Sequence, residues 1–176
     1  LPLPGRARGI DAGRVTFTCK QLEVRSDHQL VDTALIDVVV CTDLFIGSRA
    51  LWDPAKIREI VLTSAQPGSI GMAAVGSCLH PLNARDGMGM HVQIGEGGSR
   101  VLAPIAPGLI VPIAVRNYRL LSLGDEVALN PEACTIALDG ERSLEVGCQE
   151  RLTVRLTNDG PRVEDIGRCM LAATRS

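Results

Sequence analysis

The sequence predicts a mainly β protein, an antiparallel β-sandwich that also carries one or two short helices. Strand-like segments of about five to eight residues follow one another along most of the chain, separated by Gly, Pro, Asn or Asp, which is typical of sandwiches and barrels. Hydrophobic residues make up 45% of the 176 residues and charged residues 22%, as in ordinary globular domains. Aromatic residues make up only 2%, so the core must be aliphatic.

The chain is long enough for one domain with a real core. Residues 1–13 are rich in Pro, Gly and Arg and are predicted to be a linker, so the domain is expected to span residues 14–176. The chain begins with Leu1 and not with Met, so we expect either a fragment of a longer protein or a processed chain.

Two strands and a short helix are predicted in the first third. Small or apolar residues alternate with polar ones over 14–24, which predicts a strand, and a nearly continuous apolar run over 33–43 predicts a buried strand interrupted by Asp37. Asp53 and Pro54 mark a helix start, because Asp caps helices and Pro suits the first helical position. This helix should be short, since the sequence that follows it has an extended pattern.

The rest of the chain contains a series of short strand patterns. They cover residues 89–94, 100–106, 108–115, 118–123, 126–130, 134–138, 143–146, 151–156 and 162–166. Between the first two, residues 95–98 (Gly-Glu-Gly-Gly) belong to none of the phosphate-binding glycine motifs, and they are predicted to form a flexible hairpin loop.

The stretch ALDGERSLEV predicts a hairpin with a loop wider than the minimal turn. A two-residue Asp-Gly turn would place the apolar face of one strand against the polar face of the other. An odd-length loop that contains residues 139–141 removes this mismatch. It allows two registers, in which Leu144 faces either Leu138 or Ile136.

Charge and cysteine content exclude several classes of function. The net charge of -2 gives no basic surface for nucleic acid, and the scarcity of aromatics removes stacking platforms for single strands. No apolar run approaches the roughly 18 residues needed to cross a membrane, and no signal-peptide pattern is seen. The widely spaced cysteines predict reduced thiols in a cytoplasmic protein and no zinc site. They are Cys19, Cys41, Cys78, Cys134, Cys148 and Cys169.

Two segments could carry binding chemistry. Asp37 lies within an apolar strand pattern, so its carboxylate either faces a cleft or is satisfied by a partner such as an Arg. Gly68 and Ser69 precede a predicted helix over 72–78. Ser69 could simply cap this helix, or the free backbone N–H groups could attract a phosphate or a ribose oxygen.

The order of several segments resembles the C-terminal domain of the ATP-NAD kinase family. These segments are an ALIDVVV strand, a Pro-Gly-Ser stretch that opens a helix, an APGLIVPIAV strand pair, and LDGERSLEV followed by RLTVRL. The most similar branch is a group of kinase-like proteins associated with acetoin catabolism, to which LWDPAKIREIVLT and PGSIGMAAVG are similar. The resemblance covers roughly residues 34–166.

This resemblance implies a two-domain enzyme that transfers a phosphoryl group from ATP, bound with Mg²⁺, to NAD or a related hydroxyl acceptor. In the family, an N-terminal α/β domain carries a Gly-Gly-Asp-Gly motif with the catalytic base, and the C-terminal β-sandwich holds much of the NAD site. The family's Ala-Leu-Asn-Glu/Asp, Thr-Gly-Ser-Thr-Ala-Tyr and late Asp-Gly segments match residues 34–37, 67–72 and 139–140. The implied nucleotide-binding residues are Asp37, Gly68, Ser69, Asp139, Gly140 and Glu141.

The chain also departs from the family pattern. Ile36 stands where the family has Asn, while Ile70 and Met72 stand where it has Thr and Tyr. No Gly-Gly-Asp-Gly occurs, so the chain alone is expected to be catalytically inactive and to need the missing N-terminal ATP-binding domain as its partner. A homo-oligomer is expected, because a sandwich with exposed strand edges benefits from pairing. The alternative is a non-catalytic module for oligomerisation or metabolite sensing.

Overall fold

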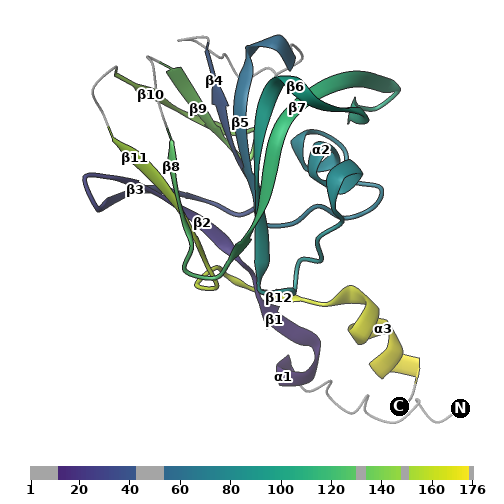
Figure 1. Ribbon diagram of the computed structural model, residues 1–176. Coiled ribbons are helices and arrows are strands. Elements are labelled where there is room, and N and C mark those ends of the chain that lie inside the picture. The colour runs from purple at the N-terminus through teal and green to yellow at the C-terminus, as the bar shows by residue number, and fades with distance from the viewer. Residues whose placement is uncertain (1–11, 43–53, 130–133, 148–150, 175–176) are drawn as a thin grey trace, which may run out of the picture.

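A computed structural model describes residues 12–42, 54–129, 134–147 and 151–174. Two antiparallel sheets pack face to face, and a small third sheet lies at one end (Figure 1). The predicted fold class, a mainly β antiparallel sandwich with short helices, is therefore confirmed. The predicted linker over residues 1–13 lies almost wholly outside the described residues.

The elements are as follows. The strands are β1 (Thr16–Thr18), β2 (Gln21–Ser26), β3 (Gln29–Ala34), β4 (Asp37–Cys41), β5 (Ile57–Leu62), β6 (Met88–Ala106), β7 (Leu109–Ser122), β8 (Glu126–Leu129), β9 (Cys134–Leu138), β10 (Arg142–Val146), β11 (Leu152–Thr157) and β12 (Arg162–Glu164). The helices are α1 (Ala12–Val15), η1 (Pro54–Lys56, a 3-10 turn), α2 (Met72–Leu79) and α3 (Ile166–Thr174).

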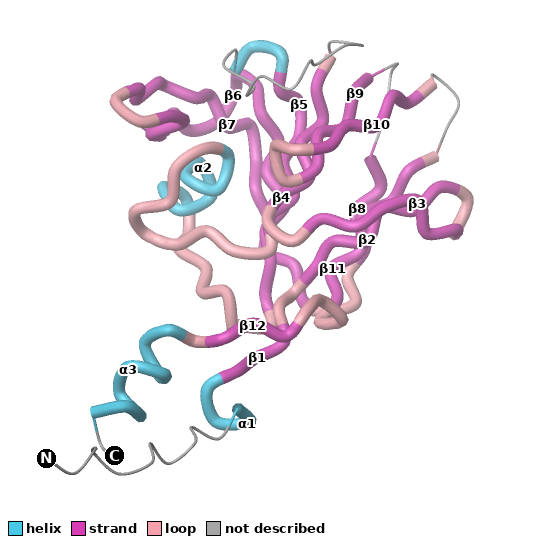
Figure 2. The backbone as a smooth tube through the Cα atoms, turned by 180° about the vertical axis from the view of Figure 1, so that it is seen from behind, coloured by secondary structure: helices cyan, strands magenta, loops and turns pink. Residues whose placement is uncertain are grey.

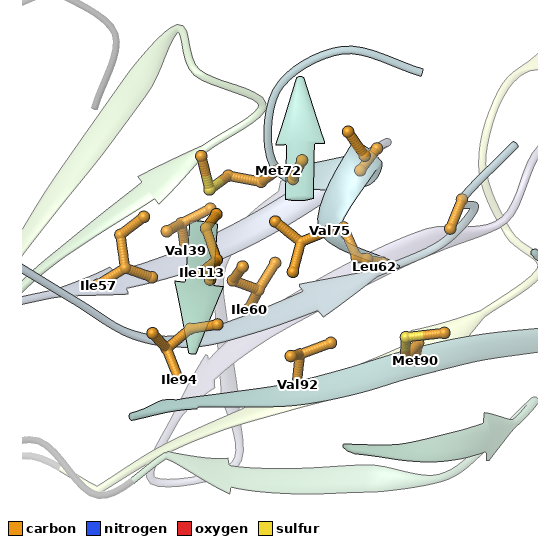
Figure 3. Close-up of a cluster of buried hydrophobic side chains, with 14 of the residues drawn as sticks. Val39, Ile57, Ile60, Leu62, Met72, Val75, Met90, Val92, Ile94 and Ile113 are labelled. Carbon is orange, nitrogen blue, oxygen red and sulfur yellow. The ribbon is translucent and has the colours of Figure 1, made fainter. Parts of the chain in front are cut away.

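The six-stranded sheet separates two hydrophobic clusters. Its strand order is β10-β9-β4-β5-β6-β7, and that of the four-stranded sheet is β3-β2-β11-β8. One cluster fills the space between these two sheets and includes Leu22, Val38 and Leu156. The other lies on the opposite face of the larger sheet, where α2 packs (Figure 3). Both clusters are aliphatic, as the low aromatic content requires.

Helix α2 lies directly against the six-stranded sheet. A Cβ at Gly76 would overlap the side chain of Leu62 and touch that of Ala65, so only glycine allows this close approach. The helix was predicted over residues 72–78 and is confirmed there. The predicted cap is wrong: the N-cap is Gly71, which has φ 82° and no side-chain capping bond, and its N–H donates to the Pro104 carbonyl at 3.0 Å.

Buried Lys20 splits the strand that alternation predicts over residues 14–24. The chain forms α1 and β1, turns at Lys20, and then enters β2 in a different sheet. The Lys20 ammonium donates to the carbonyls of Asn83, at 3.0 Å, and Met88. Burial lowers the pKa of Lys20 to about 8, and the charge of Asp86 opposes this decrease. The single predicted strand is therefore wrong, because a polar side chain at this position turns inward to reach carbonyl acceptors.

The predicted buried strand over residues 33–43 is also two strands. β3 ends at Ala34 in the four-stranded sheet, and β4 begins at Asp37 in the six-stranded sheet. Leu35 and Ile36 form the crossover between the two sheets, which Figure 2 shows from behind. The apolar run hides this crossover because both flanking strands supply side chains to the same core.

Residues 95–98 do not form the predicted hairpin loop. β6 continues through them, and both Ile94 and Ser99 pair with Val115 of β7, so the four residues form a large bulge within one long strand. Gly95 and Gly97 have φ of 144° and 102°, which allows the bulge. The turn between β6 and β7 lies instead at Pro107 and Gly108.

The predicted odd-length loop of the β9–β10 hairpin is confirmed, and it has three residues. Leu144 pairs with Ile136, which is the second of the two registers. Asp139 and Gly140 both have positive φ, 53° and 69°, and the Glu141 N–H donates to the Leu138 carbonyl at 3.0 Å. The hairpin therefore combines an Asp-Gly turn with one extra residue that restores the match of apolar faces.

Helix α3 was not predicted. It follows β12, contacts α1, and extends with it away from the sandwich (Figure 1). Asp53, the predicted cap of the first helix, lies outside the described residues, and that helix is only the 3-10 turn η1. Cys19, Cys41, Cys78 and Cys169 are free thiols. None of the helices described here is long and apolar enough to cross a membrane.

Candidate functional site

The candidate site is built around the crossover from β3 to β4, where the β9–β10 loop meets it. Asp37 is the first residue of β4 and pairs with Leu62 of β5 on one side. On the other side, the Asp139 N–H donates to the Asp37 carbonyl at 3.0 Å. Asp37 and Asp139, 102 positions apart in the sequence, thus lie beside each other.

The Asp139 carboxylate is occupied by backbone donors. Its Oδ1 accepts from the N–H groups of Leu35, Ile36 and Asp37 at 3.0, 2.7 and 3.1 Å, and its Oδ2 accepts from Leu35 at 2.9 Å. Three successive amides that converge on one carboxylate form an anion-binding concavity, and the anion here belongs to the protein itself. Asp139 therefore fixes the shape of the crossover.

Thr63 holds the same crossover from the side of β5. Its N–H donates to the Ile36 carbonyl at 3.0 Å, and its hydroxyl donates to the Leu35 carbonyl at 2.7 Å. Thr63 is itself buried. Nothing in the sequence singles it out, because a threonine after an apolar strand is common, and only the fold brings it to the crossover.

The Asp37 carboxylate is in the opposite situation. No described residue donates a hydrogen bond to it, and the nearby Arg142 is engaged with Asp32 and the Thr33 carbonyl. Burial raises the pKa of the Asp37 carboxyl from 3.8 to about 7, and the negative charge of Asp139 adds to the increase. Of the two alternatives that the sequence left open, no arginine among the described residues is a partner, so within the described part of the chain this carboxylate is an acceptor without donors.

Two apolar residues directly precede Asp37 in the chain. Leu35 and Ile36 are 41% and 50% exposed although both are large and hydrophobic. The backbone of these residues is fixed by Asp139 and Thr63, so their side chains are held at the surface. The Ile36 side chain occupies the position at which the kinase family has Asn.

Gly68 and Ser69 lie on the loop that leaves β5 and leads to α2. The Ser69 N–H donates to the Gln66 carbonyl at 3.0 Å in a tight turn, and Gly68 has φ 87° with open space around it. The loop begins at Thr63, which touches the crossover. No hydrogen bond between the described groups joins Gly68 or Ser69 to Asp37, so their part in a common site stays a prediction.

Sequence comparison places the chain in a family. Residues 20–159 match the family model of the acetoin catabolism protein X C-terminal domain. The chain belongs to the acetoin catabolism protein X family. It is 34% identical over 147 residues to acetoin catabolism protein X of Cupriavidus necator, a match that covers 82% of this chain and 41% of that relative. The chain thus spans less than half the length of this relative.

The matched region of the acetoin catabolism protein X family contains every candidate residue. Gly140 is exposed and has no atom within 4 Å of the position where a Cβ would stand, and the Glu141 side chain is exposed and makes no hydrogen bond or ion pair to another described residue. The loop is therefore open to solvent on the side away from the crossover. Within the described ranges, no cluster of three or more His, Cys, Asp or Glu side chains could hold a metal ion.

Proposed function

We propose that this chain is the nucleotide-binding C-terminal domain of an ATP-NAD kinase-like protein, which transfers a phosphoryl group from ATP to NAD or a related hydroxyl acceptor. The observation that carries the proposal is the Asp37 carboxylate, which lacks hydrogen-bond donors in a rigid crossover. The order of motifs along the chain resembles that kinase family, and membership in the acetoin catabolism protein X family agrees with the branch that the resemblance indicated.

The chemistry of the crossover suits a nucleoside. A carboxylate oxygen pair can accept hydrogen bonds from the two hydroxyl groups of a ribose, as acidic residues do in dinucleotide-binding folds. The exposed Leu35 and Ile36 side chains offer an apolar surface on which a base could pack. Gly68 and Ser69 would approach from the neighbouring loop, with the open Asp139-Gly140-Glu141 loop on the other side.

In this proposal, the chain binds the acceptor but does not supply the catalytic base. Phosphoryl transfer depends mainly on positioning and on electrostatic stabilisation of the phosphates. The base, the ATP site and the contacts to Mg²⁺ would come from the N-terminal domain of the longer protein, with Mg²⁺ arriving on ATP. The described residues provide no metal-ligand cluster of their own. Because Ile36 stands where the kinase family has Asn, the site lacks one side-chain amide, and the acceptor need not be NAD.

Helix α3 offers a surface for that N-terminal domain. Ile166, Met170 and Leu171 are 77%, 64% and 58% exposed, and none of the helix residues is buried. Such an apolar surface on one short helix indicates a contact outside the sandwich. Because α3 lies against α1, the surface is close to the place where preceding residues enter the domain. We propose that it packs against the N-terminal domain in the cytoplasmic full-length protein.

A homo-oligomer is also part of the proposal. β7 is an edge strand of the six-stranded sheet and is 14 residues long, so it presents a long row of backbone groups for pairing with a second copy. Light scattering during size-exclusion chromatography should show a dimer or a larger assembly at micromolar concentration. A monomer throughout would contradict this part.

The second candidate is a non-catalytic module that senses a metabolite or mediates assembly. It is favoured by Ile36 and Ile70, both about half exposed where the kinase family has polar side chains. The two candidates differ upstream of this chain: a Gly-Gly-Asp-Gly motif in the full-length gene favours the kinase, and its absence favours the module.

Calorimetric titration with NAD, NADP, ATP and AMP tests nucleotide binding. A dinucleotide should bind to the wild type and bind about tenfold more weakly to the Asp37→Asn variant, because the amide keeps the size of the side chain but loses one acceptor. The exposed Asp159→Asn variant is the matched control and should bind like the wild type. Equal binding by all three proteins would remove Asp37 from the site, and no binding by the full-length protein would contradict the proposal.

A further inference from the structure

A partly open pocket with several polar side chains lies between the two sheets, away from the β3–β4 crossover. Its volume is about 250 Å³. It is too small for a nucleotide, since pockets for drug-sized ligands measure roughly 300–1,000 Å³. The lining residues are His91, Gln93, Asn117, Tyr118, Arg119 and Val127. We call this cavity the inter-sheet groove.

Strand alternation directs the polar side chains into the groove. Met90 and Val92 pack in the cluster under α2, so His91 and Gln93 point to the other face of the sheet, toward the four-stranded sheet. On β7, Leu121 belongs to the cluster between the sheets, and Arg119 and Asn117 follow it on the same face.

Four of these side chains form a compact array. His91 pairs directly with Arg119, and Gln93 pairs with Asn117, in the antiparallel register of β6 and β7. Directly opposed residues in such a pair have Cβ atoms about 5 Å apart. The array brings together one imidazole, one guanidinium and two amides on a face where an aliphatic row would be expected. On the face of β7 that points toward the four-stranded sheet, the apolar Leu121 gives way to the polar Arg119 and Asn117 where the groove begins.

Glu59 determines which ring nitrogen of His91 faces the groove. His91 Nε2 lies 2.6 Å from the Glu59 carboxylate, and both side chains are largely buried, with 9% and 14% of their surfaces exposed. A carboxylate accepts only, so it holds the proton on Nε2. In the neutral ring, Nδ1 is then a hydrogen-bond acceptor, and no described residue donates to it. Since His91 lines the groove, this acceptor is available to a ligand.

Arg119 supplies a fixed cation. Its Nη2 donates to the Glu126 carbonyl of β8 at 3.1 Å, which ties the guanidinium across to the second sheet. The remaining N–H groups of the fork are free to bind a carboxylate, the geometry for which guanidinium is best suited.

We propose that the inter-sheet groove binds a small hydroxycarboxylate. The ligand carboxylate pairs with Arg119, its hydroxyl donates to His91 Nδ1, and the amides of Gln93 and Asn117 contact its remaining oxygens. The size of the cavity limits the ligand to a few carbon atoms. This site is separate from the proposed nucleotide site and does not depend on it.

Titration of ¹⁵N-labelled protein with lactate, followed by NMR, tests the proposal. Signals of groove residues should shift on addition of lactate. Propionate, which lacks the hydroxyl, and lactamide, which lacks the charge, should each bind at least about tenfold more weakly. The ring nitrogens of His91 should show a proton on Nε2, and the Nδ1 signal should move with lactate and not with propionate.

Two arginine variants provide the matched comparison. Arg119→Gln should weaken lactate binding at least about tenfold. Arg100→Gln, on an exposed side chain of the β6–β7 hairpin outside the groove, should leave lactate binding unchanged. If His91 carries its proton on Nδ1, if lactate and propionate shift the same signals equally, or if both variants bind lactate like the wild type, the proposal is overturned.

Discussion

Asp37 and Asp139 lie beside each other at the β3–β4 crossover, but their surroundings differ completely. The Asp139 carboxylate accepts from three backbone amides, whereas no described group donates to that of Asp37. A carboxylate that is saturated by backbone donors shapes the fold. The half-buried Asp37 carboxylate has no such donors among the described residues, and its partial burial disfavours the charged form, a cost that a ligand or a proton would relieve. The comparison therefore indicates a structural role for Asp139, and it is the physical basis of the binding role proposed for Asp37.

The largest effect is expected from Asp139→Ala. The substitution removes every side-chain acceptor for the amides of Leu35 and Ile36, and it frees the crossover between the two sheets. Charge-assisted hydrogen bonds of this kind contribute about 1.5–3 kcal/mol, so the free energy of unfolding should fall by roughly 2–3 kcal/mol. Urea denaturation would measure the loss.

Glu141→Ala is the control for the same loop. The Glu141 side chain is exposed and makes no hydrogen bond or ion pair to another described residue, so its removal should change the unfolding free energy by less than about 0.5 kcal/mol. If the two variants unfolded at the same urea concentration, Asp139 would have no structural role and the contrast with Asp37 would disappear.

A smaller change in the free energy of unfolding is expected at Asp37, where the substitution stabilises the protein. Its pKa is about 7 in the folded protein and near 3.8 when unfolded, so the folded state binds the proton more tightly. The stabilising contribution of this proton is fully present below about pH 4 and is lost as the pH rises through 7. Asp37→Asn removes the titration. The variant should become progressively more stable than the wild type between pH 4 and 7, by at least about 1 kcal/mol at pH 8.

Denaturation midpoints measured from pH 4 to pH 8 would show this divergence. Asp159→Asn, at an exposed position, should follow the wild type at every pH. Parallel curves for wild type and Asp37→Asn would mean that the carboxyl has a normal environment, and the argument for a ligand at Asp37 would lose its physical basis.

The fold was predictable largely because strand periodicity and apolar faces are local signals. The loop of the β9–β10 hairpin is the clearest case, since matching apolar faces required an odd number of loop residues and left two registers, of which the structure has the one with the shorter loop. The failures have a common physical origin. The crossover at Leu35 and Ile36 and the turn at Lys20 depend on partners about 60–100 residues away, which no local pattern contains.

The candidate site was predictable only through resemblance, and then only in part. The resemblance placed Asp37 and Asp139 in one site, and the fold does bring them together. It could not separate their roles, because the amides that occupy Asp139 belong to Leu35 and Ile36, whose side chains give no sign of it. His91 and Glu59 are 32 positions apart, so their contact also has no signature in the sequence.

The smallest effect is expected from Thr63→Val, which tests whether the crossover is held from both sides. Valine keeps the shape of this buried side chain but removes the hydroxyl that donates to the Leu35 carbonyl, so stability should fall by about 1 kcal/mol. The same change at Thr135 is a stringent control. That residue is equally buried, and its hydroxyl has no partner among the described groups, so Thr135→Val should be neutral or stabilising. Urea denaturation should order the proteins as Thr135→Val at or above wild type, and Thr63→Val below it. The reverse order would show that Asp139 alone holds the crossover, and that the Thr63 hydroxyl is not needed to keep Ile36 at the surface.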